Sequence, residues 1–315
     1  MAASSWQATA QLTFTQGMDP DGRTHFQGGA TAPLKVLRAV HHSDGRCELP
    51  LLHTAGGLVG GDRLRVVASL ASASRALITS VAAQKVYGSV GRSRLQPQGL
   101  WAEQQVRLHL AAGSNLEWLP QELVLFADGL YRQRLRVDLE PGASFLGAEV
   151  VRLGRTAAGE GLGRGRWRSC LEMRQRPPAP HSPLGWRHAL VDRLELDAAA
   201  LAHDHGLGGQ PVFGSLVWAA PGPLPADSLA QLLAEARQDR RGLEGSMACG
   251  PLEQGLIARY RGPSCQAARW WFTRLWARIR QLQGLPPPVL PRVWPFQEDP
   301  WAGSGPGAEP ALCGR

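Results

Sequence analysis

The sequence predicts a mainly β fold with helices only toward the C-terminus. Apolar and polar residues alternate with period two in several short segments between residues 6 and 196. Gly and Pro separate these segments, as turns between strands require. Helical spacing of apolar residues appears only beyond residue 226. At 315 residues, of which 43% are hydrophobic, the chain is long enough for one large domain or two.

The clearest predicted strand lies near the N-terminus. In residues 6–14 the apolar side chains fall on one face, from Trp6 to Phe14, and Gln or Thr fills the other. The segment 131–139 is similar, but its polar face carries Arg132, Arg134 and Arg136. The other predicted strands cover residues 34–40, 46–53, 63–70, 105–110, 166–173 and 188–196.

Two helices are predicted late in the chain. Asp227 is the expected N-cap of the first, which ends near Gly242. Ser264 is the expected N-cap of the second, whose apolar stripe runs from Ala268 to Leu282 before a run of prolines. The arginines of this second helix lie largely off the stripe, so we expect them to face away from the core.

The most glycine-rich stretch runs from Leu51 to Asp62. Gly56 and Gly57 form one pair and Gly60 and Gly61 a second pair, which predicts a tightly folded connection between strands. A binding surface is the alternative. A phosphate-binding loop is disfavoured, because the stretch lacks both the terminal Gly-Lys-Ser/Thr and a G-x-G-x-x-G that opens a helix.

The charge balance points to an anionic partner. The net charge is +8 and the sequence pI is about 9.9, with nearly all the positive charge on Arg and lysine only at Lys35 and Lys85. Dispersed Arg fits an acidic protein at least as well as nucleic acid. No segment is apolar enough for a membrane span, and no basic-then-apolar leader begins the chain, so a cytoplasmic protein is expected.

Two stretches could carry acid–base chemistry. The first contains Glu117, Glu122 and Asp128, and the second contains Glu149 and Glu160. On a regular strand Glu117 and Glu122 would point to opposite faces, although Pro120 interrupts that geometry. A hydrolase that uses two of these carboxylates therefore stays open, as does a basic β-rich nucleic-acid-binding module. Neither G-x-S-x-G nor H-E-x-x-H occurs.

Several motifs in the same order resemble the urease accessory protein family UreD, called UreH in some organisms. The resemblance is collinear from about residue 6 to about residue 296. It departs at Thr54-Ala55, where the family usually has Pro-Pro, and at Gly88, where an Arg is common. The segments that carry it are 52–62, 79–87, 116–122, 153–160 and 291–294.

The resemblance implies a fold and a function. The fold would be a helix-like wrap of two β-sheets with about two α-helices toward the C-terminus, as a single domain over residues 1–296, followed by a disordered tail over 297–315. The protein would be a non-catalytic scaffold that binds apo-urease with UreF and the GTPase UreG and assists nickel insertion. No tightly bound cofactor, nucleic acid or membrane is implied, and nickel would be in transit.

A transit protein should offer Ni²⁺ weakly held oxygen ligands rather than clustered His or Cys. We therefore predict a nickel route lined by carboxylates, with Lys85, Tyr87 and Arg155 holding the lining in place. Arg155 can pair with Glu160 across a loop. The arginine-rich strand faces, with Arg274 and Arg278 of the last helix, are the predicted interface with acidic patches on urease. The acids predicted to line the route are Asp62, Glu117, Glu122, Asp128, Glu149 and Glu160.

Overall fold

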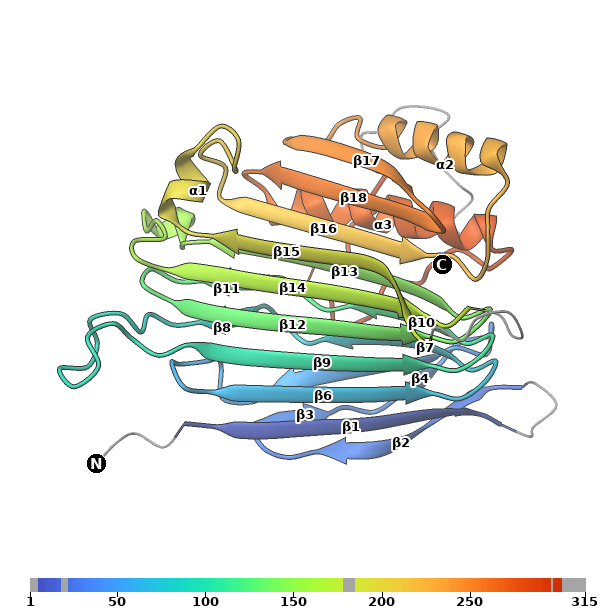
Figure 1. The fold of residues 1–315 in the computed structure, drawn as a ribbon, viewed down its shortest axis with the longest axis horizontal. Helices are drawn as coiled ribbons and strands as arrows, with labels where there is room; N and C mark the ends of the chain where they lie inside the picture. Colours follow the sequence, from blue (N-terminus) through green and yellow to red (C-terminus); the bar gives the residue numbers. More distant parts are fainter. Residues whose placement is uncertain (1–4, 18–21, 178–184, 296, 302–315) are drawn as a thin grey trace.

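The chain winds between two β-sheets that lie face to face (Figure 1). The computed structural model describes residues 5–17, 22–177, 185–295 and 297–301. In spatial order, the seven-stranded sheet contains β15 (Arg187–Leu196), β14 (Arg166–Gln175), β12 (Leu130–Leu139), β9 (Ala102–Leu110), β6 (Arg63–Leu70), β1 (Gln7–Gln16) and β2 (Thr24–Ala30).

The second sheet has eleven strands. Its main row contains β17 (Ser246–Leu252), β18 (Gly255–Gly262), β16 (Val212–Ala219), β13 (Ser144–Leu153), β10 (Asn115–Leu119), β7 (Arg75–Ser80), β5 (Cys47–His53) and β3 (Leu34–Val36). Three short strands attach beside this row: β4 (Val40–His41), β8 (Gln84–Val86) and β11 (Leu123–Leu125).

In the middle of the chain, consecutive long strands belong to different sheets. From β5 to β14 the chain passes from one sheet to the other and back, so each turn of the wrap adds one strand to each sheet. Neighbours within a sheet are consequently parallel, as in the series β6, β9, β12, β14 and in β5, β7, β10, β13. A parallel pair needs a long crossover, and here the opposite sheet provides it. The helix-like wrap of two sheets is thus confirmed.

The main apolar core lies between the sheets. The alternation predicted for the N-terminal strand is confirmed from Ala8 to Phe14, whose apolar side chains are buried and form part of this core. Trp6 is an exception, because β1 begins at Gln7 and the Trp6 side chain is 51% exposed.

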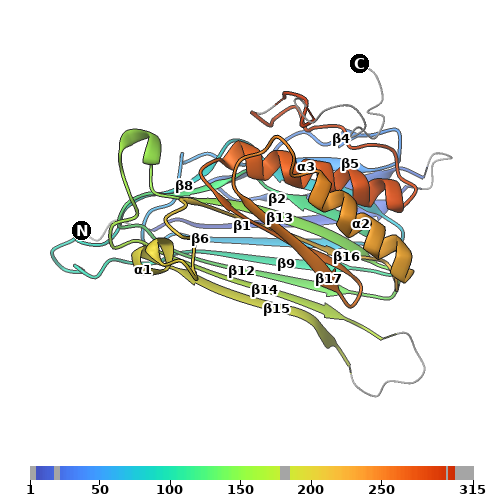
Figure 2. The ribbon, with the colours of Figure 1, turned by 90° about the horizontal axis from the view of Figure 1, so that it is seen from above.

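Helices cover the outer face of the eleven-stranded sheet (Figure 2). These are α2 (Ala226–Gln238) and α3 (Cys265–Leu282), the two predicted helices. Ser264 caps α3 by accepting a hydrogen bond from the Ala267 N–H, but Asp227 lies inside the first turn of α2 and does not cap it. The five-residue α1 (Ala198–Ala202) and the 3₁₀ turn η1 (Thr156–Ala158) were not predicted, because both are too short to show a helical period.

A buried ionic cluster joins α3 to the sheet. Glu117 of β10 accepts hydrogen bonds from Arg46 and Arg280, and the Trp276 indole N–H donates to it at 2.7 Å. Burial raises the pKa of Glu117, but Arg46 and Arg280 outweigh that effect and hold the pKa below its ordinary value. Arg280 also contacts Asp44 from the turn before β5. The cluster therefore ties three segments that are distant in the sequence.

The glycine-rich stretch is a tight connection, as predicted. Asp62 closes it by accepting hydrogen bonds from the backbone N–H groups of Trp6, at 2.8 Å, and of Val59, at 2.9 Å. A Cβ on Gly60 would lie 2.6 Å from the Leu100 carbonyl oxygen, so the close approach of these two loops requires glycine.

The end of the described chain lies against α3. Trp301 is buried, and Arg274 donates a hydrogen bond to the Pro300 carbonyl at 2.6 Å. The disorder predicted for 297–315 concerns mostly residues 302–315, which lie outside the described residues. Among the described residues, no helix has the length and apolarity needed to cross a bilayer.

Removing the charge of Glu117 should destabilise the fold strongly. We expect Glu117→Gln to lower the free energy of unfolding by about 3 kcal/mol, because Arg46 and Arg280 stay buried without a carboxylate. Glu195→Gln is the matched control, because Glu195 forms an exposed pair with Arg168 and its loss should cost less than about 1 kcal/mol. Urea unfolding of both variants measures the difference. Equal losses would contradict the role given to the cluster.

Candidate functional site

A cavity with a mainly apolar wall and several polar groups, called the polar cavity below, lies between the two sheets. Its volume is about 140 Å³, and its lining comes from both sheets. Apolar side chains form much of the wall, and the polar groups relevant here are His53, Gln121, Gln133, Glu149 and Ser169. Because the neighbouring core is apolar, each of these groups needs a partner inside the protein.

Glu149 is the acid at the centre of this lining. It lies on β13, and its carboxylate accepts a hydrogen bond from Gln133 of β12 in the opposite sheet. Gln133 also donates to Ser169 of β14 at 3.1 Å. Burial raises the pKa of Glu149 to about 7, with Gln133 and Arg259 opposing the rise. The carboxyl group therefore exchanges its proton close to neutral pH.

Two further cavity groups have no partner. Both ring nitrogens of His53 and both side-chain polar atoms of Gln121 are covered, yet none forms a hydrogen bond within the described part of the chain. Burial lowers the pKa of His53, and Asp62 opposes this shift only in part. The imidazole is therefore neutral at neutral pH and keeps a free lone pair. A neutral imidazole and an amide oxygen can each bind a cation.

Parallel pairing brings these groups to one end of the eleven-stranded sheet. His53 ends β5, Ser80 ends β7, and Gln121 follows β10 by two residues. The Gln121 backbone N–H donates to the Ser80 hydroxyl at 2.9 Å, which fixes the position of Gln121. Loops at the ends of parallel strands meet at a common edge, so three separate turns of the wrap supply this part of the cavity.

The structure does not gather the six predicted acids. Only Glu149 of the six lines the cavity between the sheets. Asp62 closes the glycine-rich connection, and Glu117 faces α3. Glu122 lies 3.8 Å from Arg269. Among the described residues, no three His, Cys, Asp or Glu side chains lie close enough together to hold a metal ion.

Asp128 and Glu160 belong to the loops at the end of the wrap. Asp128 pairs with Arg164, while Glu160 pairs with Arg155 at 2.9 Å, as the sequence suggested, and accepts from the Ala127 N–H at 2.8 Å. These pairs order loops and leave the carboxylates engaged.

Tyr87 belongs to the same end of the molecule, whereas no side-chain contact of Lys85 is seen among the described residues. Tyr87 packs edge-on against Phe126 with 5.0 Å between ring centroids. The guanidinium carbon of Arg155 lies 4.6 Å from the centroid of the same Phe126 ring. Lys85 is exposed, and its backbone carbonyl accepts from Leu58. Arg155 was predicted to hold a lining of carboxylates in place. In the structure its ion pair with Glu160 orders a loop.

The expectation that Arg274 faces a partner is wrong. Its side chain is fully buried and donates to the carbonyl groups of Asp239, Arg241 and Pro300. The helix period correctly places Arg274 off the apolar stripe, but α2 and the segment after α3 cover that second face. Arg278 is half-buried and pairs with Asp239 at 3.1 Å and Glu235 at 3.6 Å.

The sequence contains a signal for one of the missed cavity residues. Gln133 falls on the apolar face of the 131–139 segment, between Tyr131 and Leu135, where a polar side chain is unexpected. His53 and Gln121 occur inside recognised motifs, but their lack of partners depends on the folded structure.

Comparison with known proteins identifies a single family. The family model described as "UreD urease accessory protein" matches residues 7–295. The urease accessory protein UreD of Parasynechococcus marenigrum (strain WH8102) is 61% identical over 298 residues, which cover 95% of this chain and 93% of that protein. The corresponding protein of Prochlorococcus marinus (strain MIT 9303) is 60% identical over 276 residues, covering 88% and 91%.

The raised pKa of Glu149 predicts how stability depends on pH. The folded state holds this proton more tightly than the unfolded chain, so the contribution is fully present below about pH 4.5 and is lost as the pH rises through about 7. Glu149→Gln cannot lose a proton. We therefore expect its stability relative to the wild type to grow by about 3 kcal/mol between about pH 5 and about pH 8.

Urea unfolding of both proteins across this range measures the effect. All other titrating groups are shared, so they cancel in the difference. Parallel stability profiles for the two proteins would contradict a raised pKa at Glu149.

Proposed function

Because the chain belongs to the UreD family of urease accessory proteins, we propose that it binds apo-urease together with UreF and UreG and passes nickel toward the urease active site. Membership of this family makes it a non-catalytic maturation factor, and the resemblance noted in the sequence is confirmed. The alternative of a carboxylate-dependent hydrolase is set aside. Cytoplasmic location stays part of the proposal.

The observation that carries the proposal is the polar cavity between the sheets. It presents the His53 imidazole and the Gln121 amide, which have no hydrogen-bond partner among the described residues, and the carboxylate of Glu149. Ni²⁺ accepts all three kinds of ligand. Leaving such groups buried without partners costs free energy, so a cargo that supplies the missing contacts accounts for their presence better than packing does.

The chemistry favours passage over storage. A lasting nickel site needs several imidazole or thiolate ligands, whereas this cavity offers one imidazole and oxygen donors. A proton also competes with the cation at Glu149, because the pKa of that group lies at about 7. Binding at this carboxylate is therefore readily reversed near neutral pH.

The proposal assigns partner docking to the end of the wrap where His53 and Gln121 lie. The glycine-rich connection, Tyr87 and the Arg155–Glu160 pair are near this end, joined by the short β8 and β11 strands. Ordered loops beside a cavity provide a defined surface against which a second protein can align its own nickel-binding groups.

We predict that variants of the cavity impair maturation without impairing assembly. His53→Ala and Glu149→Ala should each lower the activity and nickel content of co-expressed apo-urease by about tenfold under limiting nickel, since each removes one ligand. UreF, UreG and urease subunits should still co-purify with the variants.

Glu253→Gln is the control, because it removes an exposed carboxylate from the turn between β17 and β18, outside the cavity. Urease that matures fully with both cavity variants would remove the nickel route from the proposal. Urease that matures in cells without this chain would remove the proposed function altogether.

A further inference from the structure

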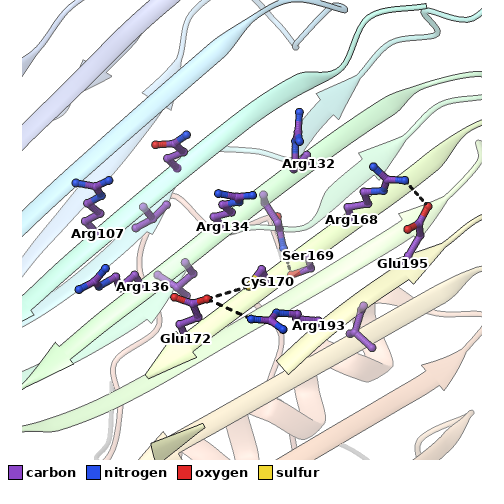
Figure 3. Close-up of a pocket in the computed structure, with 15 residues that line it drawn as sticks. Arg107, Arg132, Arg134, Arg136, Arg168, Ser169, Cys170, Glu172, Arg193 and Glu195 are labelled. Carbon is purple, nitrogen blue, oxygen red and sulfur yellow. Dashed lines mark hydrogen bonds and ion pairs between the residues drawn. The ribbon is translucent and has the colours of Figure 1, made fainter. Parts of the chain in front are cut away.

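The outer face of the seven-stranded sheet carries an arginine-rich groove (Figure 3). Its volume is about 720 Å³, and the described helices α2 and α3 cover the other sheet instead (Figure 2). Strands β9, β12, β14 and β15 supply its side chains. Six arginines and two glutamates line it: Arg107, Arg132, Arg134, Arg136, Arg168, Arg193, Glu172 and Glu195.

The strand register arranges these residues in rows across the sheet. The central row runs Arg65, Gln105, Arg134, Cys170, Arg193 from β6 to β15 and contains no acid. On one side, the next row holds Glu103 and Glu195 among its arginines. On the other side, the next row holds Glu172. The central row is thus a line of positive charge without a carboxylate of its own.

Internal ion pairs hold the arginines at the rim. Arg132 pairs with Glu103 at 2.5 Å and Arg168 with Glu195 at 3.0 Å, and the Arg168 guanidinium lies 4.6 Å from the centroid of the Trp101 ring. By contrast, Arg65, Arg107 and Arg134 are exposed and form no ion pair within the described part of the chain. In the central row Arg193 lies 3.8 Å from Glu172, so the rim is ordered and Arg65 and Arg134 are the central-row arginines open to a partner.

We propose that this groove docks an acidic segment of a partner protein, whose carboxylates pair with the central row. Arg offers a planar fork of donors that matches a carboxylate. Within the central row, Arg65 and Arg134 lie two strands apart, and so do Arg134 and Arg193. The positive charges therefore recur about every 10 Å across the sheet. Acids seven residues apart on a helix recur about every 10.5 Å and match this spacing.

The acids within the groove favour a protein over a nucleic acid. Glu172 and Glu195 would repel a continuous phosphate backbone, whereas a protein segment can place neutral or basic residues against them. The residues that line the groove include no lysine and no aromatic residue on which a base could stack, and the Arg168 guanidinium lies over the Trp101 ring.

This inference deepens the proposed function and rests on it only for the identity of the partner. Its test uses the full-length protein and two probes: a helical peptide with Glu at every seventh position, and an oligothymidylate of equal charge. Arg134→Glu reverses the central charge at an exposed position without an ion pair. Arg237→Glu is the matched control, because Arg237 is exposed on α2, on the other side of the molecule.

We expect Arg134→Glu to weaken peptide binding by at least about tenfold and Arg237→Glu to change it by less than about twofold, as measured by fluorescence anisotropy at low salt. Rising salt should weaken wild-type binding. Equal effects of the two variants, or absence of peptide binding, would overturn the proposal. Tighter binding of oligothymidylate than of the peptide, with the same dependence on Arg134, would overturn it in favour of nucleic acid.

The same variants separate this inference from the maturation role. Peptide binding is read without urease, so its failure leaves the proposed function standing. Conversely, loss of peptide binding in Arg134→Glu together with normal urease maturation in cells that lack the chain would uphold the groove and reject the maturation role.

Discussion

The fold depends on one constraint: every strand of the wrap has an inner face that loses contact with water. Most inner positions satisfy it with apolar side chains, and several polar ones satisfy it with each other. Tyr131 donates to Gln104 at 2.8 Å, and Gln133 joins Glu149 to Ser169 across the gap between the sheets. His53 and Gln121 find no hydrogen-bond partner within the part of the chain that the structure describes. Polar groups that are buried without a partner cost free energy, and a ligand that contacts them would recover part of that cost.

Charge elsewhere in the molecule serves mainly to hold segments together. Arg280 joins α3 to Glu117 and Asp44, Arg164 holds Asp128, and Arg155 holds Glu160. Other arginines, such as Arg65 and Arg134, are exposed and form no ion pair within the described part of the chain. The central row of the groove is where such arginines align. We therefore propose different ligands for the two regions: a cation for the cavity between the sheets and an acidic protein segment for the outer groove.

Local pattern predicted most of the elements but not their arrangement. Period-two alternation placed β1, β6, β9, β12 and β14, and Ser264 with its apolar stripe placed α3, because these signals lie within single segments. The wrap came from a family resemblance, since partners of a parallel strand lie a full turn away in sequence. The acid-rich stretches of the sequence did not predict that Glu149, among the six acids, would line the cavity. The other predicted acids are engaged elsewhere, and the arginine partners can be distant in the sequence: Arg46 lies 71 residues and Arg280 lies 163 residues from Glu117.

The central claim is that the interior of the wrap receives nickel. The most direct test is anomalous diffraction at the nickel edge from crystals of the full-length protein soaked with Ni²⁺ near neutral pH. A nickel peak between the sheets, within bonding distance of the His53 imidazole or the Glu149 carboxylate, is the predicted result. Peaks confined to surface histidines, with the cavity empty at the same occupancy threshold, would contradict the claim.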